Sequence, residues 1–336
     1  MTKKILVTGA GGFIGGFIVE EALRRGYDVT AAVRATTSRK FLTDSRIKFL
    51  VLDFDDEEAF TNSIAEATAV AGKWDYVVHN LGATKASSYT IFEQVNYLYI
   101  KLLVDTLIKL NLVPEKFLMM SSMSVLGVGD EKGGSPFTDK SVPFPNTKYG
   151  VSKLKGETYL RSKSDFPFVI FRPTGVYGPH EKDYFLMIKS IANGFDFSVG
   201  FKEQRLTFIY VKDLARAVCD GLEKGVPGKS YLISERKDYS QRDFRNIVKS
   251  LLGKRFVLPV TAPLWLVKCV CFISEKIARM SLKTSTLNRD KYKIIKQRNW
   301  RCSPDEAERD FGFTARYDLK AGLAEAIKWY IENGWL

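Results

Sequence analysis

A tyrosine and a lysine one helical turn apart are the residues of this chain best placed to do chemistry. Tyr149 and Lys153 stand four positions apart, so on a helix they share one face. A phenol has an ordinary pKa of about 10 and is a poor base at neutral pH, but a nearby ammonium favours the phenolate and lowers that pKa. The pair predicts proton transfer by Tyr149 with Lys153 as its activator, although an exposed surface pair would show the same spacing.

A serine pair precedes this helix at the end of a predicted strand. Residues 116–121 form that strand, and Ser121 and Ser122 end it. A serine hydroxyl at such a position can hold a substrate oxygen and stabilise the charge that develops on it. A serine, a tyrosine and a lysine together favour the interconversion of an alcohol and a ketone.

A glycine-rich loop near the start of the chain predicts a dinucleotide site. The buried strand 3–8 runs into glycines at 9, 12 and 15, and residues 12–25 have the apolar spacing of a helix. Gly9, Gly12 and Gly15 allow a tight turn, close approach to a phosphate and close packing of helix on strand. The backbone N–H groups at Phe13 and Ile14 begin that helix and can bind the pyrophosphate.

The end of the second strand, residues 28–34, indicates which dinucleotide is bound. An NAD site needs an acid there for the ribose 2′-hydroxyl, but the chain has Val33 followed by Arg34. Arg34 offers a planar donor fork for a 2′-phosphate, and Arg39 and Lys40 follow in the loop. We therefore predict NADP(H) as the preferred cofactor, with NAD(H) as the alternative.

Two further strand ends are predicted to meet the cofactor. Asp53 and Phe54 follow the strand 49–52, where a carboxylate can accept from the adenine amino group. Leu81 and Gly82 lie in a small-residue loop after the strand 74–79, where a cofactor crosses a doubly wound sheet. His79 has no adjoining Ser or Asp, so we interpret it as a buried packing residue.

Strands and helices alternate up to about residue 174, which predicts an α/β fold with a doubly wound parallel sheet of the Rossmann type. Residues 1–178, completed by parts of 205–235, are the expected dinucleotide-binding domain. Residues 179–204 and 236–336 are expected to form mainly a small substrate-covering domain.

These motifs together resemble the extended short-chain dehydrogenase/reductase family, also called the NAD-dependent epimerase/dehydratase family. The resemblance covers nearly the whole chain. Its motifs are 8–15, Asp53-Phe54, 79–83, Asn96, Ser121-Ser122, Tyr149 with Lys153, 171–179 and 205–215. Two departures from the sugar-modifying branch, Arg34 and Leu126, are more similar to the dihydroflavonol reductase and 3β-hydroxysteroid dehydrogenase branches.

The resemblance implies a role for each matching residue. Tyr149 would be the acid/base, Lys153 its activator and ribose anchor, and Ser122 the third catalytic member. Asn96 would support the active site through its helix. The cofactor would also contact Ser121, Pro173 and Val176, and the substrate would contact Ser124, Thr174 and Tyr177.

Composition limits the remaining function classes. The chain has 336 residues, a net charge of +13 and four cysteines at 219, 269, 271 and 302, which lack metal-ligand spacing. We predict no metal, reduced thiols and a cytoplasmic location, with no secretory signal at the start. The basic charge suits phosphates of cofactor, substrate or lipid, and without a recognisable motif we predict no nucleic-acid partner. A homodimer is left open.

One apolar stretch goes beyond the family pattern. Residues 262–273 are apolar almost all round but too short to span a bilayer. Basic residues follow them, at Arg279, Lys283, Arg289, Lys291, Lys293, Lys296, Arg298 and Arg301, against Asp290 alone. This pattern favours a peripheral contact of 263–301 with an anionic membrane, or a helix packed over the substrate pocket beside a solvated basic flank.

The sequence thus predicts an NADP(H)-dependent oxidoreductase acting on a lipophilic small molecule, such as a sterol-like, flavonoid-like or long-chain oxo-lipid. A nucleotide-sugar epimerase or dehydratase is the alternative. A non-catalytic NADP-sensing regulator is a third reading, which the intact Ser122, Tyr149 and Lys153 set disfavours.

Overall fold

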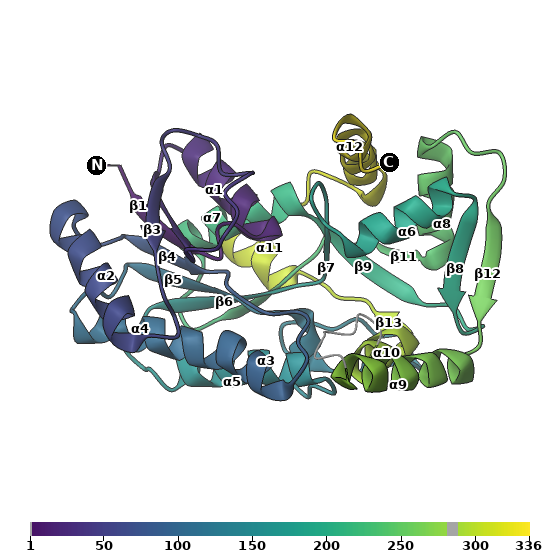
Figure 1. Cartoon of the computed structure of the whole chain (residues 1–336), viewed down its shortest axis with the longest axis horizontal. Helices are drawn as coiled ribbons and strands as arrows, with labels where there is room; N and C mark the ends of the chain where they lie inside the picture. The colour runs from purple at the N-terminus through teal and green to yellow at the C-terminus, as the bar shows by residue number, and fades with distance from the viewer. Residues whose placement is uncertain (1, 281–287) are drawn as a thin grey trace.

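The protein is described by a computed structural model, which covers residues 2–280 and 288–336, with side chains from 276 to 280 left undescribed. A seven-stranded sheet in the order β10-β6-β5-β4-β1-β2-β3 dominates its N-terminal half (Figure 1). Every neighbouring pair in it is parallel, which confirms the predicted fold class. The strands are β1 (Lys4–Thr8), β2 (Asp28–Val33), β3 (Lys48–Val51), β4 (Tyr76–His79), β5 (Lys116–Met120), β6 (Phe168–Pro173) and β10 (Ser230–Ile233).

Helices cover both faces of this sheet because its strands are apolar on both faces. In β1, Ile5 and Val7 join one core cluster while Leu6 joins the other. One face carries α1 (Phe13–Arg24), α7 (Val211–Lys224) and α11 (Asp305–Phe311), and the other carries α2 (Glu57–Ala71), α4 (Tyr99–Lys109) and α5 (Lys148–Arg161) (Figure 1).

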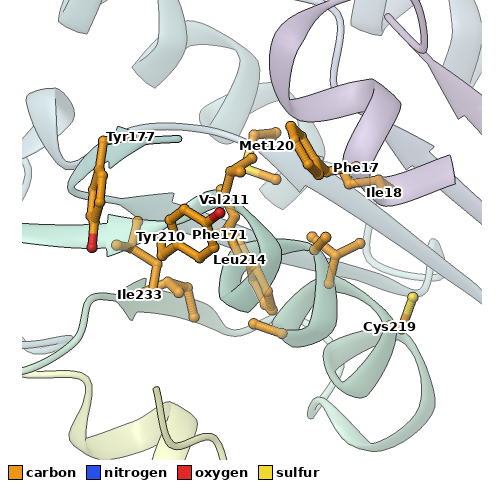
Figure 2. Packing of buried hydrophobic residues seen from close by; sticks show 14 of the residues in the cluster. Phe17, Ile18, Met120, Phe171, Tyr177, Tyr210, Val211, Leu214, Cys219 and Ile233 are labelled. Atoms are coloured by element: carbon orange, nitrogen blue, oxygen red, sulfur yellow. The ribbon is translucent and has the colours of Figure 1, made fainter. Parts of the chain in front are cut away.

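The core between α1, α7 and the sheet fixes the helix that starts at the glycine loop (Figure 2). Phe17 and Ile18 of α1 lie in the same buried cluster as Leu214 of α7 and Met120 and Phe171 of the sheet. Close packing of these side chains leaves α1 little freedom to shift. The N-terminus of α1 is therefore held at a fixed place beyond the carboxyl end of β1.

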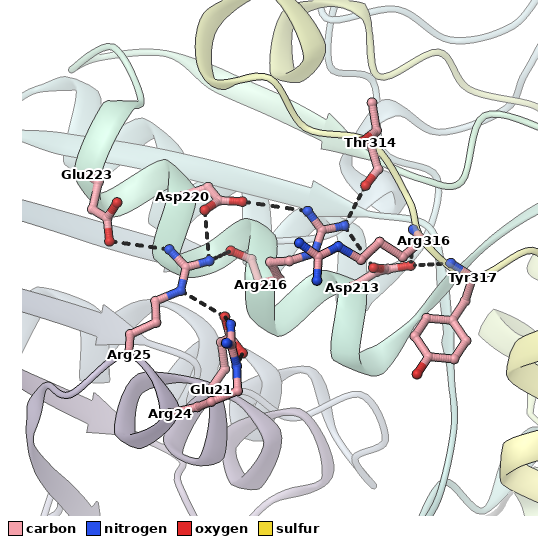
Figure 3. Close-up of polar contacts among 10 residues, drawn as sticks. All are labelled: Glu21, Arg24, Arg25, Asp213, Arg216, Asp220, Glu223, Thr314, Arg316 and Tyr317. Atoms are coloured by element: carbon pink, nitrogen blue, oxygen red, sulfur yellow. Dashed lines mark hydrogen bonds and ion pairs between the residues drawn. The ribbon is translucent and has the colours of Figure 1, made fainter.

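Polar contacts fix α7 from two sides (Figure 3). The Arg25 guanidinium after α1 bonds the Asp220 carboxylate of α7 at 2.8 Å. At the other end of α7, the Asp213 carboxylate accepts the backbone N–H groups of Arg316 and Tyr317 at 2.8 and 2.9 Å. The C-terminal segment is thereby tied to the helix layer of the main sheet.

The C-terminal half adds two smaller sheets and a group of helices (Figure 1). One sheet holds β7 (Gly175–Tyr177), β9 (Arg205–Tyr210), β11 (Asp238–Ser240) and β13 (Asn299–Trp300), and the other holds β8 (Phe195–Val199) and β12 (Leu258–Ala262). The helices are α6 (Asp183–Ala192), α8 (Gln241–Leu251), α9 (Leu264–Met280), α10 (Arg289–Lys296) and α12 (Leu319–Glu332).

The chain crosses between the two halves more than once. After β6 it enters the second half through β7, β8 and β9, and then returns with β10 to pair with β6 at the edge of the main sheet. Three short helices lie near the strand ends of the main sheet: α3 (Tyr89–Glu93), the π-helix η1 (Gln94–Leu98) and the 3₁₀-helix η2 (Met123–Leu126). Within the described residues, none of the helices has the length and apolar character needed to cross a membrane.

Candidate active site

The glycine loop has the geometry of an anion cradle. Gly9 has a φ of +68°, and a Cβ on Gly15 would lie 2.1 Å from the Gly9 carbonyl oxygen. Only glycine fits these two positions. Helix α1 begins directly after Gly12, so the N–H groups at Phe13 and Ile14 have no acceptor inside the helix. The predicted loop residues therefore fit a dinucleotide pyrophosphate.

The turn that follows β2 lies against the glycine loop. The Arg34 backbone N–H donates to the Thr37 hydroxyl at 3.0 Å, which closes the turn. A Cβ on Gly11 would stand 2.3 Å from the Thr37 methyl group, so the turn and the loop are in contact. The Arg34 side chain is exposed beside them. A cation is thus available at the edge of the predicted phosphate cradle.

The other two predicted cations of this loop rest on aromatic rings. The Arg39 guanidinium lies 4.3 Å from the centre of the Phe49 ring. The Lys40 ammonium lies 5.4 Å from the centre of the Phe41 ring. Such cation–π contacts leave hydrogen-bond donors free for another acceptor. Both residues therefore remain candidates for contact with a cofactor phosphate.

Asp53 and Phe54 follow β3 as predicted but play different structural parts. Asp53 is exposed, and its carboxylate accepts the backbone N–H of Asp55 at 3.0 Å. The Phe54 ring is buried and packs 4.9 Å from the Tyr99 ring of α4. Phe54 thus holds the loop in place, while Asp53 presents its carboxylate to solvent.

Helix α5 presents Tyr149 and Lys153 at its first turns. The Thr147 hydroxyl caps the helix by accepting the Gly150 N–H at 3.0 Å. The Lys153 ammonium is buried and donates to the Met120 carbonyl at 2.9 Å. A Cβ on Gly82 would lie 2.7 Å from that ammonium nitrogen, so the small residue at this position makes room for Lys153. Burial lowers the pKa of Lys153 to about 8.

The Tyr149 phenol lies within hydrogen-bond reach of the Ser122 hydroxyl. Burial raises the pKa of the Tyr149 phenol, and only the Ser122 hydroxyl opposes that shift. Lys153 is instead directed at the Met120 carbonyl. That Lys153, together with a bound nicotinamide, lowers the pKa of Tyr149 therefore stays a prediction.

The serine side of the site is built from η2. The Ser122 hydroxyl caps this short helix by accepting the Ser124 N–H at 3.1 Å. A Cβ on Gly150 would lie 2.5 Å from the Ser124 carbonyl oxygen, so η2 packs on the first turn of α5. Phe92 of α3 closes another side, with its ring centre 6.2 Å from that of Tyr149. The structure thus brings Ser122, Ser124 and Tyr149 together.

Asn96 connects the loop after β4 to helix α5. It lies in the π-helix η1, a form that is frequent at functional sites. Its amide oxygen accepts the Ala83 N–H at 2.9 Å, and its amide nitrogen donates to the Ala83 carbonyl at 3.0 Å and to the Ser152 hydroxyl at 2.9 Å. Asn96 thereby positions the segment that contains Leu81 and Gly82.

Sequence reasoning missed a buried charge network beneath the site. The Ser121 hydroxyl donates to the Glu157 carboxylate at 2.6 Å, and the Arg172 guanidinium bonds the same carboxylate at 3.0 Å. Glu157 also favours the charged form of Lys153, which partly offsets the effect of burial on the Lys153 pKa. Two signals were available: Glu157 follows Lys153 by one turn, and Arg172 interrupts an apolar strand.

Comparison with known proteins places this arrangement in a family. A model of the NAD-dependent epimerase/dehydratase family matches residues 5–234, which is more than half of the 336 residues. The chain belongs to this family. The resemblance predicted from the motifs is confirmed, and so is an enzyme of the extended short-chain dehydrogenase/reductase type.

Members of the epimerase/dehydratase family with different substrates are similar to this chain. UDP-glucose 4-epimerase of Vibrio cholerae is 26% identical over 96% of this chain and 97% of its own. The decarboxylating sterol-4-alpha-carboxylate 3-dehydrogenase of Dictyostelium discoideum is 24% identical over 96% and 99%. The dTDP-glucose 4,6-dehydratase of Streptomyces venezuelae, solved with NAD bound, has the same fold, with a TM-score of 0.78, 20% identity and coverage of 99% and 98%.

The residues of the family motif 171–179 lie partly near the surface and partly in the core. Pro173 ends β6, and the Thr174 hydroxyl donates to the Thr207 carbonyl at 2.7 Å. Val176 is partly exposed in β7. Tyr177 is 1% exposed and packs edge-on against Phe208, so the prediction that it contacts substrate is wrong: its side chain belongs to the core.

His79 of this epimerase/dehydratase family member is a packing residue, as predicted. It is 1% exposed, and its Nδ1 lies 3.1 Å from the Thr8 hydroxyl. Burial lowers the pKa of His79 to about 3, with the charge of Lys153 acting in the same direction. The imidazole is therefore neutral at physiological pH.

The basic segment contacts the start of helix α5 through α10. The Asp290 carboxylate accepts the Lys148 backbone N–H at 2.8 Å, and the Lys293 ammonium donates to the Asn146 carbonyl at 2.8 Å. Both contacts are within three residues of Tyr149. Lys283 of the predicted basic run lies outside the described residues, as does the side chain of Arg279.

Proposed function

We propose that this enzyme is an NADP(H)-dependent oxidoreductase that interconverts a secondary alcohol and a ketone on a lipophilic substrate. The observation that carries the proposal is the meeting of Ser122 and Tyr149 at the strand ends of the sheet whose β1 runs into the glycine loop. A nicotinamide bound there would supply the hydride acceptor or donor.

Residues of the chain would transfer the proton, hold the substrate oxygen and bind the cofactor. The Tyr149 phenol passes the proton to or from the substrate oxygen, and the Ser122 hydroxyl holds that oxygen. Lys153 anchors the cofactor ribose and, once drawn away from the Met120 carbonyl, favours the phenolate. Asn96 positions the cofactor loop. The pyrophosphate and nicotinamide contacts are assigned to Gly9, Gly12, Phe13, Ile14, Gly15, Leu81, Gly82, Pro173 and Val176, and substrate contacts to Ser124 and Thr174.

The preference for NADP(H) rests on the turn after β2. Val33 ends the strand where an NAD site carries an acid, and Arg34 is exposed in the turn packed on the glycine loop. A guanidinium there pairs with a 2′-phosphate by charge-assisted hydrogen bonds. NAD, which the Streptomyces structure contains, is the alternative cofactor.

Replacing Arg34 by alanine should weaken NADPH binding by on the order of 1.5–3 kcal/mol, because the variant loses a charged hydrogen bond to the 2′-phosphate. NADH binding should change little. Calorimetric dissociation constants for both cofactors measure the difference. Arg46→Ala is the matched control, since Arg46 lies in the same connection but is engaged by Asp44 at 2.7 Å. Equal losses for NADPH and NADH would remove Arg34 from cofactor selection.

A lipophilic substrate is supported by the state of the arginines in the C-terminal half. Arg205 is paired with Glu203 at 2.7 Å, and Arg301 is paired with Asp238 at 3.2 Å. Arg298 donates to the Lys202 carbonyl at 2.7 Å. Guanidinium groups already engaged by protein acceptors are less available to a sugar diphosphate. The similarity to a sterol dehydrogenase points in the same direction.

A nucleotide-sugar epimerase or dehydratase is the second candidate. Relatives with these activities match this chain over nearly its full length. Lys85 and Lys291 both contact the Asp183 carboxylate, at 2.5 and 3.5 Å, and would offer ammonium groups to a diphosphate if that acid were displaced. A non-catalytic sensor is disfavoured, since a sensor has no need of the Tyr149 phenol.

The deciding experiment offers both substrate classes to the purified protein. We expect NADPH consumption with a long-chain 3-oxo lipid or a sterol ketone in mixed micelles, with the matching alcohol detected by mass spectrometry. UDP-glucose and dTDP-glucose should bind weakly and stay unchanged. Tight binding of either sugar nucleotide, with no lipid reduced, would promote the second candidate.

A further inference from the structure

Helix α9 turns several apolar side chains of its first three turns toward solvent. Trp265 is 67% exposed, Phe272 50% and Ile273 56%, whereas Cys271 is buried. At 100° per residue, the three exposed positions fall within one side of the helix, opposite Cys271. The outward side of α9 is therefore apolar, and among these three side chains Phe272 has the Arg289 guanidinium 4.6 Å from its ring centre.

The two-stranded sheet before α9 also has an apolar outer face. Phe197 is 62% exposed, and Phe195 and Leu258 on the same face are paired in register. The opposite face of the sheet points toward the protein, because Asp196 on that face is buried and paired with Arg245 of α8 at 3.3 Å. The alternation of a strand thus directs these aromatic rings away from the protein.

Two loop residues link this sheet to α9. Phe201 and Phe256 are 80% and 70% exposed beside β8 and β12. The Gly200 N–H donates to the Ala262 carbonyl at 2.8 Å, directly before α9 begins. Figure 1 shows β8 and β12 at the end of the molecule away from β1 and β3, with α9 starting near β12 and running back below α10 and β13. We call the exposed set the apolar tip: Phe197, Phe201, Phe256, Trp265, Phe272 and Ile273.

Basic side chains accompany the apolar tip. Lys202 follows Phe201, Lys254 and Arg255 precede Phe256, and Lys268 lies one turn from Trp265. All four are exposed, and within the described part of the chain none of them forms an ion pair. Aromatic side chains that alternate with unpaired cations suit a surface that is apolar inside and anionic at its boundary.

We propose that the apolar tip docks this enzyme on an anionic lipid bilayer. The aromatic and aliphatic side chains enter the boundary between headgroups and acyl chains, and the four cations contact lipid phosphates. The proposal rests on the lipid substrate class of the proposed function and deepens it. Because α10 contacts residues 146 and 148 beside Tyr149, docking would bring the active-site helix close to the membrane.

The test is vesicle co-sedimentation of the full chain without cofactor or substrate. We expect binding to phosphatidylcholine vesicles containing phosphatidylglycerol at about 0.05 M salt, and much weaker binding at about 0.5 M, where charges are screened. Trp265→Glu should reduce binding at least about tenfold by losing apolar burial and adding a repelled charge. Val70→Glu is the matched control, since Val70 is 93% exposed on α2, which lies at the end of the molecule opposite β8 and β12 (Figure 1).

Circular dichroism and NADPH affinity confirm that each variant folds. No binding to anionic vesicles at low salt, or equal loss in the two variants, would overturn the proposal. So would a dimer that depends on Trp265 without vesicle binding, because a second copy would then cover the tip. Co-sedimentation measures binding alone, so the two proposals can fail separately. If the enzyme reduces a lipid but does not bind vesicles, only the docking proposal is overturned. If it binds vesicles but reduces no lipid, only the proposed activity is overturned.

Discussion

Replacing Tyr149 by phenylalanine should lower turnover at least about 10²-fold, the scale of a general acid/base contribution. The variant keeps the ring that packs beside Phe92 and loses only the hydroxyl that acts with Ser122. Cofactor affinity should stay close to that of the wild type, because the glycine loop is untouched. Steady-state rates with the lipid ketone measure the loss of turnover. NADPH dissociation constants measure cofactor affinity separately.

Tyr159→Phe is the control for this prediction. Tyr159 lies in the same helix, but its hydroxyl bonds Asp105 on the outer side of α4, away from the site. The Tyr159→Phe enzyme should turn over substrate at the rate of the wild type. Near-normal turnover of Tyr149→Phe, with an intact fold, would show that another group moves the proton.

Removing Arg172 should lower the free energy of unfolding by about 3–5 kcal/mol, the range found when one partner of a buried ion pair is deleted. Arg172 and Glu157 have side chains only 4% and 1% exposed, and Glu157 also receives the Ser121 hydroxyl. Arg172→Met would leave this carboxylate buried without the guanidinium that bonds both of its oxygens. Urea unfolding followed by circular dichroism gives the loss directly.

Arg236→Met provides the comparison at the surface. Arg236, like Arg172, is paired with carboxylates, here those of Asp305 and Glu308. Its side chain, however, is 49% exposed. Solvent screening limits such a contribution to about 1 kcal/mol or less. Combining Arg172→Met with Glu157→Met should recover part of the lost stability, since neither charge of this pair then stays buried. Similar losses at both arginines would contradict a special role for burial.

The sheet and the dinucleotide loop could be predicted because their signals are local. The apolar strand 4–8, the glycines after it and the helix at 13–24 lie within one short stretch, and periodicity identifies each of them. The same holds for Tyr149 and Lys153, whose shared helix face follows from spacing alone. His79 was assigned correctly because a buried strand end with no chemical partner favours packing.

The remaining features depend on contacts between distant residues. The acceptor of Lys153 is the Met120 carbonyl, and backbone oxygens have no signature in a sequence. Tyr177 follows the family motif, but its burial comes from α12, whose Gly322 lies against its ring. The pairing of β8 with β12 joins segments 63 residues apart, so the direction of Phe197 was not visible from its neighbours.

The late return of β10 to the main sheet has a consequence during synthesis on the ribosome. Until residue 233 has emerged, β6 is an open edge of apolar parallel sheet, and unpaired edges recruit strands from other chains. A nascent chain that stops near residue 178 would carry the whole glycine loop and the Tyr149 helix without this protection. Such fragments should aggregate or require a chaperone, and the cofactor half cannot mature ahead of the segments that surround the substrate.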